Sequence, residues 1–182
     1  YRSSRGLGDV YKRQIINNDL ANTIGNLLNR TSTMSRKWFN NKVPYKDNST
    51  NDKKLENYSK DIVSNYLNNL NSYKLDLAAN DILSLAIKTN LYLNDNQPWI
   101  LIKDVNNISL VSDVIYNVLE STRIIGLLLL PLLPDLSSKI NLQLGSLYDE
   151  NLSWNAQLKW GKLNSNSILP PPNPIINKLE YE

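Results

Sequence analysis

The stretch from Leu20 to Phe39, LANTIGNLLNRTSTMSRKWF, constrains the fold most, because as an α-helix it has two well-separated faces. At roughly 100° per residue, its large apolar side chains fall in one arc and its polar side chains fall in the opposite arc. We predict that the apolar arc is buried and that the polar arc faces outward. The apolar arc holds Leu20, Ile24, Leu27, Leu28, Met34 and Trp38. The polar arc holds Asn22, Asn26, Arg30, Thr33 and Lys37.

This polar arc lies in a stretch with a local excess of positive charge. From Leu20 to Lys46 the sequence has five basic residues and no acidic one. Asn26 and Arg30 lie four residues apart, so their side chains are neighbours on a helix. The asparagine amide both donates and accepts hydrogen bonds, and the guanidinium has five donors, so the pair is suited to the edges of nucleic-acid bases. The simpler alternative is that the arc is only solvated surface, as the polar face of an amphipathic helix usually is.

The composition argues against a self-contained active site. The chain has 182 residues, with no cysteine and no histidine. Disulfides, thiolate or imidazole metal ligands and nucleophile–histidine pairs are therefore excluded within it. Its carboxylates are not clustered, so paired acid–base or hard-metal chemistry has little support.

Residues 1–14, YRSSRGLGDVYKRQ, hold the entire net charge of +3, with four basic residues and one acidic residue. The remaining residues hold sixteen of each sign. The opening segment has neither a helical nor a strand period and resembles translated sequencing-adapter read-through. We expect it to be an unstructured artefact outside the fold, so any electrostatic argument rests on the local cluster after Leu20.

Four helical patterns, separated by prolines or polar segments, predict an all-α antiparallel bundle. A short fifth helix should end near Gly145. The bundle would then span residues 15–145, and residues 146–182 would form a proline-stiffened arm. We expect the third helix to lie against the first, with Leu75, Ile87 and Leu91 on its apolar stripe. The four patterns cover about residues 15–40, 52–71, 76–94 and 110–130.

Pro98 ends the third helix and fixes Trp99 at the corner that follows. A tryptophan in such a place is more often a core anchor than a ligand contact. The three apolar residues that follow, Ile100 to Ile102, can supply the core contact themselves, which leaves the indole free to face Arg30.

The arm contains apolar side chains that need a partner, namely Trp154, Trp160, Ile175 and Ile176. We expect the arm to pack back on the bundle and on a domain outside this sequence.

The motifs DLANTIGNLLNR, TNLYLNDNQPW, VLESTR with LLLPLLP, and PIINKLE resemble, in order and spacing, the anticodon-binding helical domain of methionyl-tRNA synthetases. These enzymes are class I aminoacyl-tRNA ligases, and the resemblance covers nearly all of residues 15–180. It implies recognition of the CAU anticodon of the methionine tRNAs, initiator and elongator, by Asn26, Arg30 and Trp99. It leaves Arg36, Lys37 and Lys42 as candidates for phosphate contacts.

The resemblance also implies what lies outside this chain. The family's catalytic Rossmann domain carries HIGH and KMSKS signatures, and neither occurs in these 182 residues. We therefore expect a C-terminal fragment that is inactive alone and whose partner, besides tRNA, is that catalytic domain. ATP with magnesium, and a structural zinc ion where the family has one, would belong to the full-length parent. The family is cytoplasmic and has no membrane partner.

Two alternatives stay open. Another class I synthetase, of the cysteine, valine, leucine or isoleucine type, would share the helical architecture, although the set of Asn26, Arg30 and Trp99 argues against it. A free-standing helical protein-interaction module would use its tryptophans as hot spots and the polar arc as solvated surface.

Overall fold

The computed structural model describes residues 23–46, 52–146, 148–171, 173 and 175. Within them the backbone is helical, and its one β pairing is an isolated antiparallel bridge between Lys42 and Ile168. The all-α prediction is confirmed. The segment 1–14 and the predicted start of the first helix lie outside the described residues. The long helices are α2 (Asn26–Trp38), α3 (Lys54–Asn71), α4 (Leu75–Asn96), α6 (Ile108–Leu129) and α7 (Pro134–Gln143); the short ones are α5 (Pro98–Leu101), η2 (Val105–Asn107) and α8 (Trp154–Gln157).

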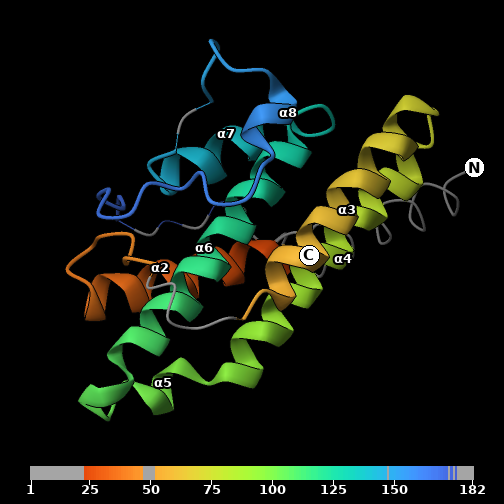
Figure 1. The fold of residues 1–182 in the computed structure, drawn as a ribbon. Helices are drawn as coiled ribbons and strands as arrows, with labels where there is room; N and C mark the ends of the chain where they lie inside the picture. Colours follow the sequence, from red (N-terminus) through yellow and green to blue (C-terminus); the bar gives the residue numbers. More distant parts are fainter. Residues whose placement is uncertain (1–22, 47–51, 147, 172, 174, 176–182) are drawn as a thin grey trace, which may run out of the picture.

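Helix α6 is the centre of the fold (Figure 1), and α2, α3, α4, α5 and α7 all contact it. Every residue from Val111 to Leu129 is buried, which explains why the sequence is apolar on nearly all sides of this helix. Close packing continues at Gly126, where an added Cβ would lie 2.9 Å from Cγ2 of Ile140 on α7. Across the part of the chain that the structure describes, no helix has the length and apolar character needed to cross a membrane.

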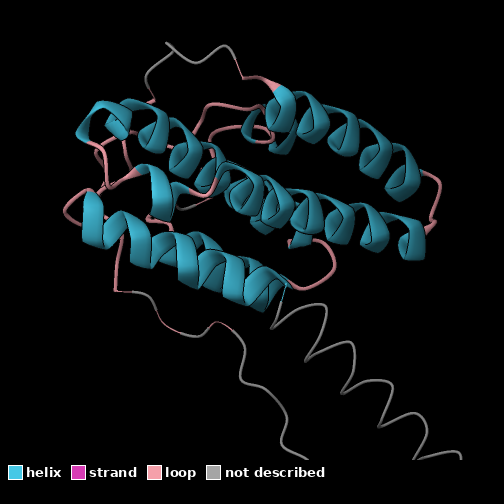
Figure 2. Ribbon diagram, turned by 90° about the horizontal axis from the view of Figure 1, so that it is seen from below, coloured by secondary structure: helices cyan, strands magenta, loops and turns pink. Residues whose placement is uncertain are grey.

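Helices α3 and α4 form an antiparallel hairpin beside α6 (Figure 2). Helix α3 lies within the helical pattern predicted for residues 52–71, and it buries a narrow stripe that includes Leu55, Ile62 and Tyr66. The Tyr66 hydroxyl donates a hydrogen bond of 2.7 Å to the Leu128 carbonyl, so this buried phenol has a partner.

Helix α4 differs from the prediction, because it buries a narrower stripe. Leu75, Ile87 and Leu91 are 52%, 53% and 49% exposed, whereas the sequence placed them in the core. Helix α4 packs mainly on α3 and α6, and it meets the first helix through Asn90 and Asn94, which reach Thr23 and Arg30. The exposed positions on α4 follow from this packing, because α6 is buried on all its sides and takes part of the apolar face of α4 itself.

The chain leaves α2 through a tight turn at Asn40 and Asn41, whose φ angles are 52° and 61°. Asparagine tolerates this left-handed region better than most residues. The turn directs residues 41–43 against the arm. The pairing consists of Val43 N–H to the Ser167 carbonyl (2.9 Å), Asn166 N–H to the Val43 carbonyl (2.8 Å) and Leu169 N–H to the Asn41 carbonyl (2.7 Å).

The arm is held on α6 by a buried ion pair, which we call the arm clamp: Glu120 and Arg123. Their side chains are 0% and 3% exposed, and Arg123 Nη2 lies 2.6 Å from Glu120 Oε1. Arg123 also donates to the carbonyls of Gln157 and Lys159. The Glu120 carboxylate accepts hydrogen bonds from three arm N–H groups. These belong to Gly161 (2.7 Å), Lys162 (3.1 Å) and Leu163 (2.9 Å).

Tyr116, one turn before the clamp on α6, adds another tie to the arm. Its hydroxyl donates to the Leu163 carbonyl at 3.0 Å. Burial, together with the nearby Glu120 carboxylate, raises the pKa of the Tyr116 phenol well above its usual value. The phenol therefore stays protonated and able to donate.

The apolar side chains of the arm have partners within the bundle, one of the two partners that we expected for them. The Trp154 ring meets the Tyr66 ring edge-on, with centroids 6.0 Å apart. Ile175 is buried, and Trp160 packs against the core. The arm also contains α8, a helical turn that the sequence did not predict, which is capped where the Ser153 side chain accepts a hydrogen bond from the Ala156 N–H. Ile176 lies outside the described residues.

Candidate nucleic-acid interface

Helix α2 presents the two faces that the sequence predicted. Asn26, Arg30, Thr33 and Lys37 are exposed on one side. On the other side Ile24, just before the helix, is buried together with Leu27 and Leu28, while Met34 and Trp38 are half-buried. Small buried residues, Thr31, Ser32 and Ser35, let α2 lie close to α6. Asn22 and Leu20 lie outside the described residues.

Trp99 stands where the sequence predicted a corner. Gln97 adopts a left-handed conformation with φ of 42°, and Pro98 opens α5 at a helix position that suits proline. Trp99 is half-buried and packs against the core, while its neighbour Ile100 is exposed. The indole is thus neither a fully buried anchor nor a free side chain.

The structure brings Arg30 and Trp99 together. The Arg30 guanidinium carbon lies 5.7 Å from the centroid of the Trp99 ring, within cation–π range. Asn26, one helical turn earlier, is exposed on the same face of α2 as Arg30. An exposed amide, a guanidinium and an aromatic ring therefore share one side of the bundle.

Asn94 of α4 completes this group, although the sequence did not single it out. Arg30 Nη2 lies 3.4 Å from its Oδ1. One turn earlier, Asn90 donates a hydrogen bond to the Thr23 carbonyl at 3.1 Å, so two asparagines of α4 touch the start of α2. The sequence signal that could have identified Asn90 and Asn94 is their spacing of four residues, which places both on one face of the helix just before the Pro98 corner.

The predicted basic cluster is only partly available. Arg36, Lys37 and Lys42 are exposed, and Arg36 Nε donates to Asn41 Oδ1 at 2.8 Å. Lys46 instead turns toward the bundle. Its ammonium lies 3.7 Å from a Glu56 carboxylate oxygen and 5.9 Å from the centroid of the Tyr116 ring. The free positive charge therefore concentrates at the end of α2 and in the turn that follows.

Comparison with known families points to one assignment. Residues 43–182 match the model of the "anticodon binding domain of methionyl tRNA ligase". A methionine–tRNA ligase of Listeria monocytogenes serotype 4b is 35% identical over 171 residues, which cover 92% of this chain and 26% of that protein. The methionine–tRNA ligase of Synechocystis is 37% identical, covering 91% of this chain and 33% of that protein. The chain thus spans about a quarter to a third of the length of these relatives.

Solved structures agree with the sequence comparison. The free methionyl-tRNA synthetase of Mycobacterium tuberculosis superposes with a TM-score of 0.84 at 26% identity, over 93% of this chain and 34% of that one. The same enzyme bound by methionyl-adenylate gives 0.81 at 27% identity, over 90% of this chain and 32% of that one. These matches do not favour either alternative, the other class I synthetases or the free-standing interaction module.

Proposed function

The chain belongs to the family of anticodon-binding domains of methionyl-tRNA ligases, and we propose on that premise that it binds the CAU anticodon loop of the methionine tRNAs, initiator and elongator. The contact of Arg30 with Trp99 supports this proposal more than any other observation. Single-stranded RNA loops are recognised by stacking unstacked bases on aromatic rings and by hydrogen bonds to their edges.

Each of the three side chains has a distinct role in this proposal. The half-buried Trp99 ring offers a stacking plane whose position is supported by the core behind it. Arg30 donates in a planar fork, and Asn26 both donates and accepts, so the two can bind the Watson–Crick edges of splayed bases. Asn94 orients the Arg30 guanidinium, because its Oδ1 accepts a hydrogen bond of 3.4 Å from Nη2.

The exposed basic residues at the end of α2 have a different role. Arg36, Lys37 and Lys42 are proposed to contact phosphates, which fixes the register of the loop without reading its sequence. No acidic residue stands between Leu20 and Lys46 to oppose them. Their contribution is electrostatic and therefore falls with salt.

We propose that the parent protein is a methionine–tRNA ligase that uses ATP and that this part alone is inactive. The relatives carry that name, and a related enzyme is known with methionyl-adenylate bound. Without cysteine or histidine, this chain offers no usual ligand for zinc other than carboxylates. ATP, magnesium and any structural zinc are therefore assigned to the parent's catalytic Rossmann domain, the second proposed partner, in a cytoplasmic enzyme.

Binding of labelled anticodon stem-loops tests the proposal. The chain should prefer the CAU loop over loops in which one anticodon base is changed, by about 1–3 kcal/mol for each base read. The variant Lys139→Ala is a charge-matched control, since Lys139 is an exposed residue of α7 outside the proposed site. Equal affinity for CAU and for a valine or isoleucine anticodon loop would contradict the proposal.

A further inference from the structure

Two contacts within the protein hold the guanidinium of Arg30 at the proposed anticodon-binding site. Its central carbon lies 5.7 Å from the centroid of the Trp99 ring on α5, and its Nη2 donates a hydrogen bond of 3.4 Å to Oδ1 of Asn94 on α4. A long exposed side chain otherwise samples many rotamers, so these contacts select one position among them. Arg30 therefore has a resting position against the ring.

The resting guanidinium takes up space that a stacked base needs. Two stacked aromatic rings have centroids about 4.5–7 Å apart, and the Arg30 carbon lies within that range of the Trp99 centroid. Trp99 is half-buried and packs against the core, so only part of its ring is open to a base. Arg30 is exposed and therefore lies over that open part. A base can stack on Trp99 only after the guanidinium has moved.

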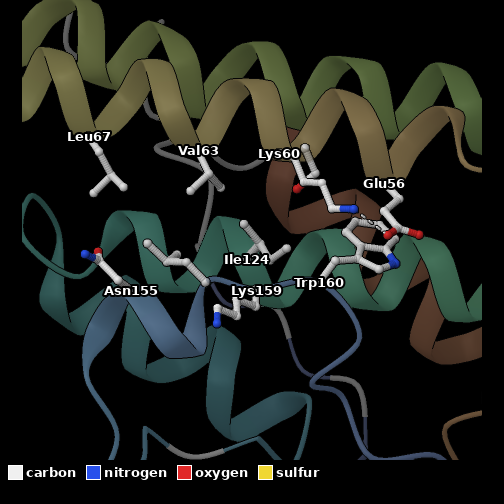
Figure 3. Close-up of a pocket in the computed structure, with 10 residues that line it drawn as sticks. Glu56, Lys60, Val63, Leu67, Ile124, Asn155, Lys159 and Trp160 are labelled. Atoms are coloured by element: carbon white, nitrogen blue, oxygen red, sulfur yellow. Dashed lines mark hydrogen bonds and ion pairs between the residues drawn. The ribbon is translucent and has the colours of Figure 1, made fainter.

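The hold on Arg30 is weak enough to be released. In the cavity between α3, α6 and the arm (Figure 3), Lys60 Nζ lies 2.7 Å from Glu56 Oε1, so that cation is paired with a carboxylate. Arg30 is held by a ring and a neutral amide instead. An exposed cation–π contact corresponds to about a two- to fivefold preference in an equilibrium constant. The guanidinium thus rests on the ring in most molecules and leaves it in the others.

The edge of the incoming base decides whether this release is compensated. A guanidinium carries donors only, so it needs acceptors in exchange for the contacts that it gives up. Cytosine offers two adjacent acceptors, O2 and N3, on its Watson–Crick edge. Guanine in the same place presents the donors N1–H and N2–H₂, so it gains stacking on the ring but does not bind the displaced guanidinium there. The resting contact therefore separates bases by their edges.

We propose that Arg30 is a gate on the Trp99 stacking plane, which admits a base whose edge binds the guanidinium and hinders other bases. This role rests on the proposed function and adds to it the rejection of wrong anticodons. Specificity of this kind uses a contact that the wrong ligand must break without compensation. Because about two to five molecules have the guanidinium on the ring for each one without it, such a base loses about three- to sixfold in affinity.

Removal of the gate should improve the binding of wrong loops. The test uses anticodon stem-loops in which guanine replaces each base of CAU in turn. Arg30→Ala should weaken binding of the CAU loop, because the guanidinium no longer binds its base. For the loop whose guanine meets Trp99, the same variant should gain about three- to sixfold in affinity, once the effect of the lost positive charge is subtracted. That loop also identifies the base that stacks on the ring.

The variant Trp99→Leu supplies this subtraction. Leucine keeps an apolar side chain against the core but has no aromatic plane to cover, whereas the charge lost in Arg30→Ala is the same in both backgrounds. The change in affinity caused by Arg30→Ala is therefore measured with and without Trp99→Leu, by fluorescence anisotropy of labelled loops at one salt concentration. The gain should appear only where Trp99 is present.

Asn94→Ala is a second variant, which keeps every charge and serves if Trp99→Leu does not fold. It releases one of the two contacts of the guanidinium, so affinity for the same guanine loop should rise about twofold. An equal response to Arg30→Ala in both backgrounds, or no gain in Asn94→Ala, overturns the gate. If the wild-type chain prefers the CAU loop under these results, only the gate fails. If it does not prefer that loop, the proposed function fails and the gate fails with it.

Discussion

Two arginines of this fold, Arg30 and Arg123, occupy opposite environments. Arg30 is exposed on α2 and lies over one ring, and its one hydrogen bond with the described residues is a long contact, 3.4 Å, with an asparagine oxygen. Arg123 is 3% exposed and makes four hydrogen bonds between 2.6 and 2.9 Å, two with Glu120 and two with backbone carbonyls.

The difference separates an arginine that holds the protein together from one that is available to a ligand. A guanidinium has five donors, and at Arg123 most of them are already satisfied inside the protein. At Arg30 most donors have no partner in the part of the chain that the structure describes, while the Trp99 ring and Asn94 limit the directions in which they point. The same residue type therefore serves stability at one place and recognition at the other.

Removal of the clamp carboxylate should have the largest effect. Glu120→Ala leaves the Arg123 guanidinium buried without its counter-charge and three arm N–H groups without an acceptor. We expect a loss of about 3–5 kcal/mol in the free energy of unfolding, measured by urea denaturation. The amides of Gly161 to Leu163 should lose protection from hydrogen exchange first.

Arg30→Ala is the matched control for stability, since it removes an exposed guanidinium. It should change the free energy of unfolding by no more than about 0.5 kcal/mol. If Glu120→Ala and Arg30→Ala lowered the free energy of unfolding by similar amounts, the contrast between the two arginine environments would be wrong.

Trp99→Ala should have the largest effect on RNA binding. Loss of the stacking plane should weaken binding of the CAU stem-loop by about 1–3 kcal/mol, measured by fluorescence anisotropy. Trp99→Phe keeps an aromatic plane and should recover part of that loss. Because Trp99 also packs against the core, unfolding is measured in parallel. A variant that loses stability but keeps its RNA affinity per folded molecule would assign Trp99 to the core alone.

Arg30→Ala should weaken RNA binding by a similar amount, about 1–3 kcal/mol, and should also relax the preference among anticodon bases. Arg30→Lys separates charge from geometry, because lysine keeps the charge but lacks the planar fork. Lysine should restore the dependence on salt but not the base preference. Full recovery of base preference by lysine would show that the guanidinium geometry is unimportant.

Lys37→Ala should have the smallest effect and should not depend on sequence. As an exposed phosphate contact, Lys37 contributes equally to all RNA loops. Its removal should reduce the slope of log affinity against log salt by about one. A base-dependent loss would assign Lys37 to recognition instead.

The sequence predicted those features that depend on a clear periodicity. The two faces of α2 and the approximate bounds of α3 and α6 follow from residue spacing, and Pro98 set the corner at Trp99. The meeting of Arg30 with Trp99 needed more, since it depends on how α2 and α5 each pack on α6. The anticodon-binding role of these residues came from the family resemblance and stays a prediction.

The sequence did not predict features that depend on competition between elements. Ile87 and Leu91 fit an apolar stripe, yet α6 and α3 occupy the rest of the α4 surface and leave both exposed. Glu120 and Arg123 resemble an ordinary surface pair three residues apart, and only their position within an otherwise apolar helix indicated burial. Because that pair was missed, the sequence did not show how the arm is fixed to the bundle.

The pairing of residues 41–43 with residues 166–169 has a consequence for the order of folding. These two segments are far apart in the sequence, so their pairing closes a very long loop. It therefore cannot form from contacts between neighbouring residues alone. Helices α3, α4 and α6 can assemble through shorter loops beforehand. We therefore expect arm closure to be the slowest step, and a refolding chain to acquire its helices well before residues 166–169 reach the end of α2.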